Sequence, residues 1–285
     1  MAMLEAVKAK VWLFHLRFSA LTRRSLSRNV LREICSYFED PQYFVAIDSH
    51  RMHLYNFSTH EITEYEIPLY VISGFIQVDR TTVLIVGEKV MTLDVLSLQV
   101  TPQAPLLNPR NFVGVIQVGK TVYAFGGDFP EVTFCEKSNV LHIDWTPLPP
   151  MNYASKALTP CVYKDLIYLV SITYSNHSAI ETFNIHTETF AVVPVSFTEH
   201  IEAYWNLVTF VANGELIILT QYRFFAWKIE SESGFRKGHT PRECQSYRAP
   251  LVVGTKVYIS VRGYVDIWNL ETMKYMKTSK YQIRE

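Results

Sequence analysis

From residue 41 onward the sequence alternates apolar and polar positions in short runs that are separated by turn residues. Two such runs, Val113 to Val118 and Thr121 to Phe125, are joined by Gly119-Lys120. A period of two residues predicts half-buried strands, and a glycine-containing pair between two such runs predicts a β-hairpin. A third run ends near Asp144, so residues 110–151 as a whole fit four short antiparallel strands.

The first hairpin of this unit recurs along the chain. Equivalent turn pairs between alternating apolar runs are Asp79-Arg80, Lys164-Asp165, Asn213-Gly214 and Gly254-Thr255. With Phe44 to Ile47 as the start of a first unit, the pattern predicts six repeats, at about 41–70, 71–109, 110–154, 155–202, 203–247 and 248–281. The first repeat lacks its innermost strand, and we expect Tyr281-Gln282-Ile283 to complete it, because closed sheet arrays leave no free edge.

A second motif marks a later turn of each repeat. It is an Asp or Asn that ends an apolar run and is followed by a Ser- or Thr-containing turn, with copies at Asn56, Asp94, Asn184 and Asn269. The side-chain oxygen can accept hydrogen bonds from amides two or three residues on, which fixes the turn locally. Each copy therefore predicts a strand end.

The 110–151 unit resembles a kelch repeat, in which one unit forms one blade of a β-propeller. Arg110 opens the unit, Gly126-Gly127 follow an aromatic strand, and Trp145 leads into Pro147-Leu148-Pro149-Pro150-Met151. The glycines would end a strand where a Cβ is disfavoured, and Trp145 would cover the gap between neighbouring sheets. The resemblance implies an all-β, six-bladed kelch-like propeller over residues 41–285. Only this unit has paired glycines, and Val265 to Leu270 also resembles a WD-repeat strand, so a WD-like propeller is the alternative.

Residues 1–40 differ in kind, since they are basic, poor in glycine and apolar at helical spacing. They predict a short α-helical segment that packs on the propeller or on a partner. We expect one or two helices, and near the end of the segment one helical side carries Val30, Leu31, Ile34, Tyr37 and Phe38. This stretch is similar to the first helix of an F-box, although Pro41 and the strand after it leave no room for the other F-box helices. A mitochondrial presequence is a further alternative.

The composition of the chain narrows the classes of binding partner to expect. Lys and Arg together number 27, as do Asp and Glu, so no net charge attracts nucleic acid or an anionic membrane. No apolar run is long enough to predict a membrane-spanning helix. Cys35, Cys135, Cys161 and Cys244 are widely spaced, which favours free core thiols in a reducing, cytoplasmic compartment.

The sequence offers no recognisable catalytic pattern. Phosphate-binding and dinucleotide glycine loops, a Gly-x-Ser-x-Gly elbow and a His-Glu-x-x-His helix do not occur. His50 and His53 are three residues apart beside a predicted strand, which favours a surface pair over a metal site. We therefore expect no enzyme activity, no cofactor and no metal.

Binding residues are expected in the loops between the second and third strands of the repeats, because loops vary while the blades stay rigid. The candidates are Asp128, Phe129, Tyr174, Asn176, His177, Tyr222, Arg223, Arg262 and Tyr264. Aromatic and arginine side chains are common in protein interfaces. The expectation is a scaffold or adaptor that binds a protein partner. The alternatives are an F-box/kelch-type substrate receptor, whose partner would be a ubiquitin-ligase adaptor, and an enzyme with a site in the central channel.

Overall fold

The chain divides into two compact units, Met1–Gln42 and Tyr43–Glu285. The computed structural model describes residues 43–56, 62–71, 74–79, 81–127, 132–155, 158–172, 178–194, 207–220, 223–231, 234–239, 251–253, 256–261, 264–269 and 274–280. Every element in these ranges is a β-strand. The predicted N-terminal helices, with Val30, Leu31, Ile34, Tyr37 and Phe38, lie outside these ranges, and so does Tyr281-Gln282-Ile283.

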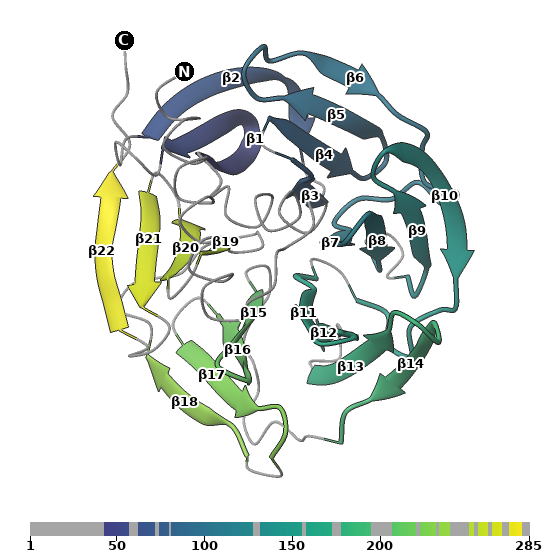
Figure 1. Ribbon diagram of the computed structural model, residues 1–285, viewed down its shortest axis with the longest axis vertical. Coiled ribbons are helices and arrows are strands. Elements are labelled where there is room, and N and C mark those ends of the chain that lie inside the picture. Colours follow the sequence, from purple (N-terminus) through teal and green to yellow (C-terminus); the bar gives the residue numbers. More distant parts are fainter. Residues whose placement is uncertain are drawn as a thin grey trace, which may run out of the picture. The chain divides into compact units, whose positions relative to one another are not determined.

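Five four-stranded sheets follow one another along the chain, and in each the strands lie side by side in sequence order. All neighbouring strands are antiparallel. In Figure 1 the first strand of each sheet lies nearest the centre and the fourth lies at the rim. This is a propeller-like arrangement. The strands are β3 Gly74–Gln77, β4 Thr82–Val86, β5 Val90–Asp94, β6 Val100–Pro102, β7 Gly114–Val118, β8 Thr121–Phe125, β9 Cys135–Asn139, β10 His142–Leu148, β11 Cys161–Tyr163, β12 Leu166–Ile172, β13 Ser178–Asn184, β14 Thr189–Val192, β15 Val208–Ala212, β16 Glu215–Leu219, β17 Arg223–Lys228, β18 Arg236–His239, β19 Leu251–Val253, β20 Lys256–Val261, β21 Tyr264–Asn269 and β22 Lys274–Lys280.

The first segment of this unit departs from the predicted repeat. It forms a two-stranded sheet of β1 Tyr43–Asn56 and β2 Ile62–Val71, with a register shift between Ser49 and Arg51. The predicted count of six blades is therefore wrong for the described strands. The reason is local: the 14 residues of β1 contain no glycine or proline, and next to Asp48-Ser49 the strand makes a register shift, between Ser49 and Arg51, instead of a hairpin turn, so the chain continues as one irregular strand.

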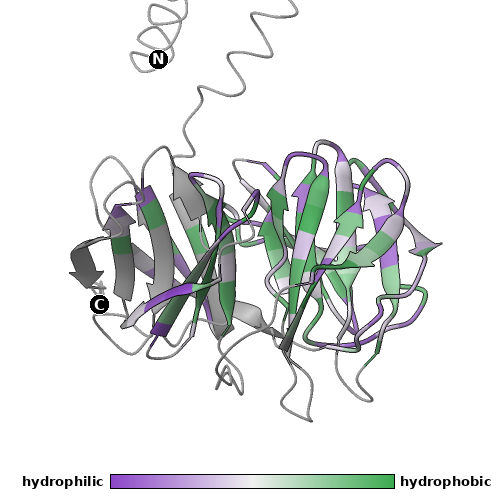
Figure 2. Ribbon diagram, turned by 90° about the horizontal axis from the view of Figure 1, so that it is seen from below, coloured by the Kyte–Doolittle hydropathy of each residue, from purple (hydrophilic) through white to green (hydrophobic). Residues whose placement is uncertain are grey.

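The second strands of four of the sheets, β4, β8, β12 and β16, are buried on both faces. In β4, Val83 and Ile85 pack in one cluster with residues of β1, while Leu84 and Val86 pack in another with residues of β7 and β8. Successive side chains of a strand point to opposite faces, so such a strand joins two neighbouring sheets. The same division recurs in β8, β12 and β16. Figure 2 shows hydrophobic residues along many of the strands and hydrophilic residues in several of the loops that join them.

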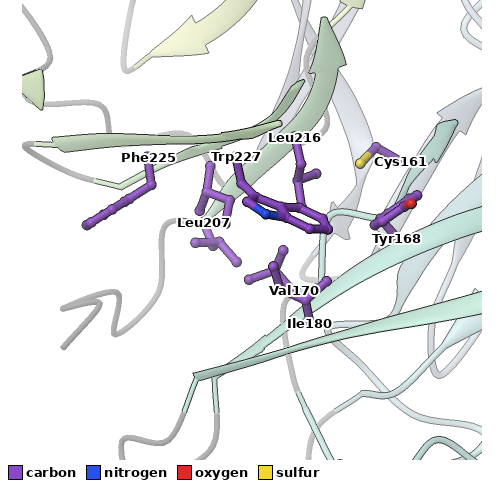
Figure 3. Packing of buried hydrophobic residues seen from close by; sticks show 9 residues of the cluster. Cys161, Tyr168, Val170, Ile180, Leu207, Leu216, Phe225 and Trp227 are labelled. Atoms are coloured by element: carbon purple, nitrogen blue, oxygen red, sulfur yellow. The ribbon is translucent and has the colours of Figure 1, made fainter. Parts of the chain in front are cut away.

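Figure 3 shows one of the clusters between sheets. Tyr168, Val170 and Ile180 of the β11–β14 sheet meet Leu216 and Trp227 of the β15–β18 sheet. Full burial of each aliphatic or aromatic side chain stabilises the fold by about 1.5–3 kcal/mol. Packing between successive sheets therefore stabilises this unit.

Trp145 spans such a gap from the rim. It belongs to β10, is 4% exposed, and packs with Leu84, Val86 and Leu106. Its indole Nε1 donates a hydrogen bond to the carbonyl of Ala104 at 3.1 Å. The single polar atom of this large side chain therefore has a partner, which allows the ring to be buried.

The Asp and Asn motif makes the local hydrogen bonds that its chemistry allows. Asp94 Oδ1 accepts from the amides of Leu96 and Ser97 at 3.1 and 2.7 Å. Asn184 Oδ1 does the same for the second and third amides after it, at 2.9 and 3.0 Å. Asn56 and Asn269 are the last residues of β1 and β21. A comparable bond joins Asn139 Oδ1 to the amide of Leu141, a copy of the motif that the sequence pattern had missed.

Candidate functional site

Two kinds of connection share one end of each sheet. In an antiparallel sheet of four strands, the loop between strands two and three lies at the same end as the segments that enter strand one and leave strand four. We call this the loop end. The tight turns between strands one and two and between strands three and four lie at the opposite end, the turn end.

The loop end is described most fully around the β7–β10 sheet. Residues 103–113 lead into β7, residues 126–127 and 132–134 are the two sides of the loop after β8, and residues 149–155 leave β10. Together we call them the loop platform. Its three segments are far apart in the sequence, so specific contacts must hold them together.

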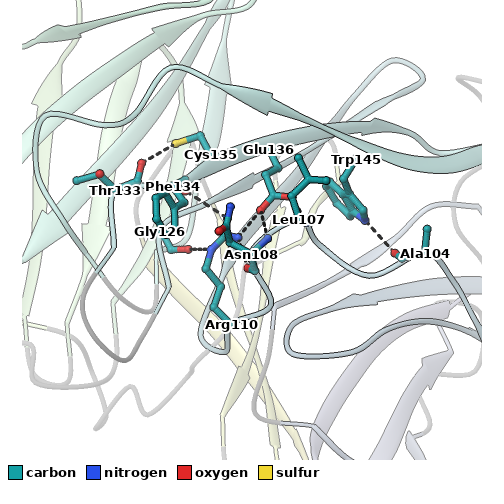
Figure 4. Close-up of polar contacts among 10 residues, drawn as sticks. All are labelled: Ala104, Leu107, Asn108, Arg110, Gly126, Thr133, Phe134, Cys135, Glu136 and Trp145. Carbon is teal, nitrogen blue, oxygen red and sulfur yellow. Dashed lines mark hydrogen bonds and ion pairs between the residues drawn. The ribbon is translucent and has the colours of Figure 1, made fainter.

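A buried ion pair makes the first of these contacts (Figure 4). Arg110 Nη1 lies 2.5 Å from Glu136 Oε1, and the two residues are 6% and 1% exposed. Glu136 also accepts hydrogen bonds from the amides of Leu107 and Asn108, at 2.7 and 3.3 Å. The guanidinium donates to the carbonyls of Asn108, Gly126 and Phe134. Each buried charge is thus both paired and hydrogen-bonded, which offsets its loss of water.

The same loop is tied to the segment that leaves β10. The amide of Gly127 donates to the carbonyl of Ser155, and the amide of Met151 donates to the carbonyl of Thr133, both at 3.0 Å. A Cβ on Gly126, whose φ is +58°, would lie 2.3 Å from the carbonyl oxygen of Ser155. Glycine is required here both for the backbone angle and for the close approach.

A second buried glutamate repeats this arrangement in the next sheet. Glu181 accepts hydrogen bonds from the amides of Asn152 and Tyr153, at 2.8 and 2.9 Å, and from Asn152 Nδ2 at 2.8 Å. It occupies the same register position as Glu136, since Glu136 pairs with Ala124 and Glu181 pairs with Leu169. A carboxylate on the third strand therefore holds the incoming connection in both sheets.

Sequence reasoning missed these glutamates, although a signal for them exists. Glu136, Glu181 and Asp266 each lie three residues before the Asn that ends the third strand. Met91 and Phe225 occupy the equivalent register position in the β3–β6 and β15–β18 sheets. An acidic residue at this spacing thus distinguishes some repeats from others.

Among the described residues of the platform, most exposed side chains are apolar and none is charged. Arg110 is the one charged residue among its described members, and it is buried. Leu107 and Phe134 are 54% and 46% exposed, values that are high for side chains of this size. Further exposed members are Ala104, Pro105, Asn108, Pro109, Pro149, Pro150 and Asn152.

The platform also contains a backbone outlier. Phe112, just before β7, has a φ of +54°. This conformation is uncommon for a bulky residue and persists only where the surroundings fix it. The outlier lies two residues from Arg110, inside the segment that the ion pair fixes.

The turn end is charged by contrast. Ion pairs join Lys137 to Glu188 and Lys164 to Glu230, each across neighbouring sheets. The hydrogen bond from Lys164 lowers the pKa of the exposed Glu230 carboxyl, and the same bond raises the pKa of Lys164. His186 Nε2 lies 3.2 Å from Asp165 Oδ1. The turn end therefore differs in charge from the described part of the loop platform.

Most of the predicted site residues lie outside the described ranges: Asp128, Phe129, Tyr174, Asn176, His177, Tyr222 and Arg262. Arg223 and Tyr264 are the first residues of β17 and β21, at the loop end. Arg223 is exposed, and its backbone closes a tight loop through bonds with Thr220. Asp128 and Phe129 belong to the loop whose two sides are part of the platform.

The innermost strands offer little chemistry. Their sequences in the five four-stranded sheets are GFIQ, GVIQV, CVY, VTFVA and LVV. None of these described strands contains Asp, Glu, His, Lys or Arg. In addition, no helix of the described ranges has the length and apolar character needed to cross a membrane.

Comparison with protein-family models gives no match to this chain. The search of curated proteins finds none that matches its sequence. What the structure shows is thus a propeller-like arrangement of antiparallel sheets, and the resemblance to kelch repeats depends on the residues quoted for it.

Proposed function

We propose that the chain is a non-enzymatic, cytoplasmic scaffold or adaptor, a divergent kelch-like propeller that binds a protein partner through its loop end. The observation that carries this proposal is the loop platform, where exposed apolar residues are mounted on segments fixed by a buried ion pair. Such a surface resembles the central part of protein interfaces, which is depleted in charge and enriched in apolar side chains.

The hydrogen-bonded backbone of the loop platform is a second argument for the proposal. Binding costs free energy when loops and side chains lose freedom, so a surface whose backbone is already fixed binds with a smaller penalty. Arg110 and Glu136 hold the backbone at Leu107 and Phe134, and Gly127 and Met151 bond the loop to the next segment. The loop end therefore has the properties of a preformed contact surface.

The enzyme alternative would need polar or acidic side chains that converge on the centre. The described innermost strands carry apolar residues with a few Gln, Thr and Tyr. General acid–base or nucleophilic catalysis requires titratable or activated groups within reach of a substrate. These strands favour the binding proposal over a central catalytic site.

The F-box alternative depends on the apolar side of the 30–38 segment, which resembles the first F-box helix. It predicts that full-length protein retains a ubiquitin-ligase adaptor in a pull-down and that deletion of residues 1–40 abolishes the retention. Full-length protein that never retains the adaptor would exclude this version and leave the scaffold proposal intact.

The scaffold proposal is tested by affinity purification of the intact chain with mass spectrometry. We expect a protein that copurifies reproducibly, and less of it with a variant carrying Tyr222→Ala, Arg223→Ala and Arg262→Ala. Thermal unfolding of the variant serves as the folding control. The proposal fails if the intact, folded chain recovers no protein above the background of an unrelated bait.

A further inference from the structure

The outermost strand of the β11–β14 sheet presents a strand edge at the rim (Figure 1). Among the described strands, β14 is hydrogen-bonded only to β13. We propose that its outer edge pairs antiparallel with β14 of a second copy of this chain, so that two four-stranded sheets join into one. This proposal is independent of the proposed scaffold function, because it concerns the rim and not the loop end.

The rim strands of the other four sheets carry features that hinder the addition of a further strand. Prolines, charged side chains and irregular register are such features. β6 ends in Pro102, and β10 contains Pro147 and a register shift. β18 and β22 carry basic side chains, at Arg236, Lys237, Lys274, Lys277 and Lys280.

The sequence of β14 differs from all of these. Its four residues, Thr189–Val192, include no proline and no charged residue, and its register with β13 is unbroken. Thr, Phe and Val are residues that favour strands. Val192 is 46% exposed, a high value for this side chain. A regular, uncharged edge of this kind is a template for another strand.

The hydrogen bonds to β13 show which backbone groups of β14 face outward. The amide of Val193 donates to the carbonyl of Ile180 at 2.9 Å, and the carbonyl of Ala191 accepts from a threonine hydroxyl of β13 at 3.4 Å. In an antiparallel strand the backbone groups of successive residues point to opposite sides. Phe190 and Val192 therefore direct their N–H and C=O groups outward, where a second strand can bond to them.

A second copy of β14 fits this edge because the strand is complementary to itself. With Ala191 on the twofold axis, Phe190 of each copy lies opposite Val192 of the other, and each such pair exchanges two hydrogen bonds. An aromatic residue opposite a β-branched one is a favourable cross-strand pair. Ala191 faces its own copy, and its small side chain permits the close approach. The same pairing of β18 or β22 would bring basic side chains together, which is unfavourable.

The residues that flank β14 limit the length of the new pairing. Glu188 precedes the strand and is paired with Lys137, and Pro194 follows Val193. In the dimer each Glu188 lies opposite Pro194 of the other copy, so like charges do not meet, and the proline has no N–H to donate. So short a contact buries less than the roughly 800 Å² per partner of a standard interface, and we expect a Kd of about 10 µM or weaker.

The oligomeric state of the full chain tests the proposal. Sedimentation equilibrium is measured from about 5 µM to about 500 µM, a range that includes the expected Kd. The mean mass of the wild type should rise with concentration above the 33.0 kDa of one chain. Hydrogen exchange of the Phe190 and Val192 amides should slow over the same range, because the second strand bonds to these groups.

Charged variants at the twofold axis test the register. Ala191→Lys places two like charges opposite each other and should raise the Kd of the dimer by about tenfold or more. Ala191→Glu should have the same effect. An equal mixture of the two variants should dimerise again, because opposite charges then meet at the axis, and salt should weaken this mixed dimer.

Thr101→Lys is the matched control on another rim strand. Thr101 of β6 is exposed and pairs with Thr92, at the register position that Ala191 has opposite Thr182. The substitution adds the same charge to a different edge and should leave the Kd unchanged. Thermal unfolding of each variant establishes that it folds.

Three results would overturn the proposal: a wild-type chain that stays monomeric at about 500 µM, a dimer that Ala191→Lys leaves intact, or a mixture of the oppositely charged variants that does not dimerise. An equal loss of dimer with Thr101→Lys would also overturn it, since β14 would then not be the contact. A strand of another protein as the occupant would appear as a copurifying protein that Ala191→Lys releases while the wild type stays monomeric. That outcome would show that the second copy is the wrong partner. None of these results decides whether the loop end binds a protein.

Discussion

At the scale of single residues, the Arg110–Glu136 pair has the largest structural effect. It lies where the incoming connection, the loop after β8 and the start of β9 meet, and both partners are nearly inaccessible to water. Removing one partner of a buried pair leaves the other charge without compensation, which costs more than the pair itself contributes. The pair is therefore a sensitive point for mutation.

We predict that Glu136→Ala lowers the free energy of unfolding by about 3–5 kcal/mol in urea denaturation. Glu188→Ala is the matched control, because its ion pair with Lys137 is partly exposed and should contribute about 1 kcal/mol or less. Equal effects of the two substitutions would show that burial of the Arg110–Glu136 pair does not matter.

A second residue-scale prediction concerns acid. The hydrogen bond from the backbone amide of Ser97, followed by that from its hydroxyl, lowers the pKa of Asp94 in the folded protein. Because the folded pKa lies below the unfolded value, the stabilisation is present above pH of about 4 and is lost as the pH falls through the folded pKa. Between pH 5 and 3, the urea midpoint of the wild type should fall further than that of Asp94→Asn. Parallel curves for the two proteins would contradict this.

At the scale of elements, the two ends of β8 carry glycines with the same backbone angle and different surroundings. Gly119, in the β7–β8 turn, and Gly126, at the end of β8, have nearly the same φ of +60° and +58°. A Cβ at Gly119 would meet nothing within 4 Å, whereas one at Gly126 would meet the Ser155 carbonyl at 2.3 Å. The two positions thus separate backbone strain from steric conflict.

Gly119→Ala should therefore destabilise the protein by about 1–2 kcal/mol through its backbone conformation alone. Gly126→Ala should destabilise the protein clearly more than Gly119→Ala, because the segment after β10 must move. Urea denaturation of both variants measures the two effects. A Gly126→Ala variant as stable as Gly119→Ala would show that the close approach to Ser155 is absent in solution.

Strands and hairpins could be predicted from the sequence because their cause is local. Runs with a period of two, joined by pairs such as Gly119-Lys120 and Asn213-Gly214, correspond to the hairpins β7–β8 and β15–β16. The β1–β2 segment was wrongly predicted to be a blade. Its sequence was counted as a repeat, but β1 continues as one strand without a hairpin turn inside it.

The buried glutamates were missed for a different reason. In Cys135-Glu136-Lys137 the charged residues read as the exposed face of a strand, and Glu136 is buried only because a segment 28 residues earlier folds over it. The burial of such a residue depends on how the connection between successive sheets folds, which the local sequence pattern does not predict. Of the predicted binding residues, only Arg223 and Tyr264 fall in described ranges, at the loop end, and the binding role of all nine stays a prediction.

At the scale of the whole Tyr43–Glu285 unit, five clusters join successive sheets in a row. The second strands β4, β8, β12 and β16 each belong to two clusters, so the loss of one of these sheets removes packing from its neighbours. Successive sheets are therefore expected to unfold together, as in repeat proteins with strong contacts between neighbours.

The reactivity of two cysteines tests whether successive sheets unfold together. Burial raises the pKa of the Cys135 and Cys161 thiols to about 12, and they lie in successive sheets. Neither thiol should react with iodoacetamide in the native protein, since the thiolate is the reactive form. In increasing urea, mass spectrometry of the digested protein should show both labelled over the same range. Labelling of one at clearly lower urea would show that the sheets open independently.

Binding at the loop end is tested most directly by hydrogen exchange of the intact chain, free and with the protein that copurifies with it. We predict slower exchange in residues 103–113 and 132–134 when the partner is bound, and unchanged exchange in the turns at 163–166 and 184–189. Protection confined to those turns, with the loop platform unaffected, would contradict the proposed binding surface.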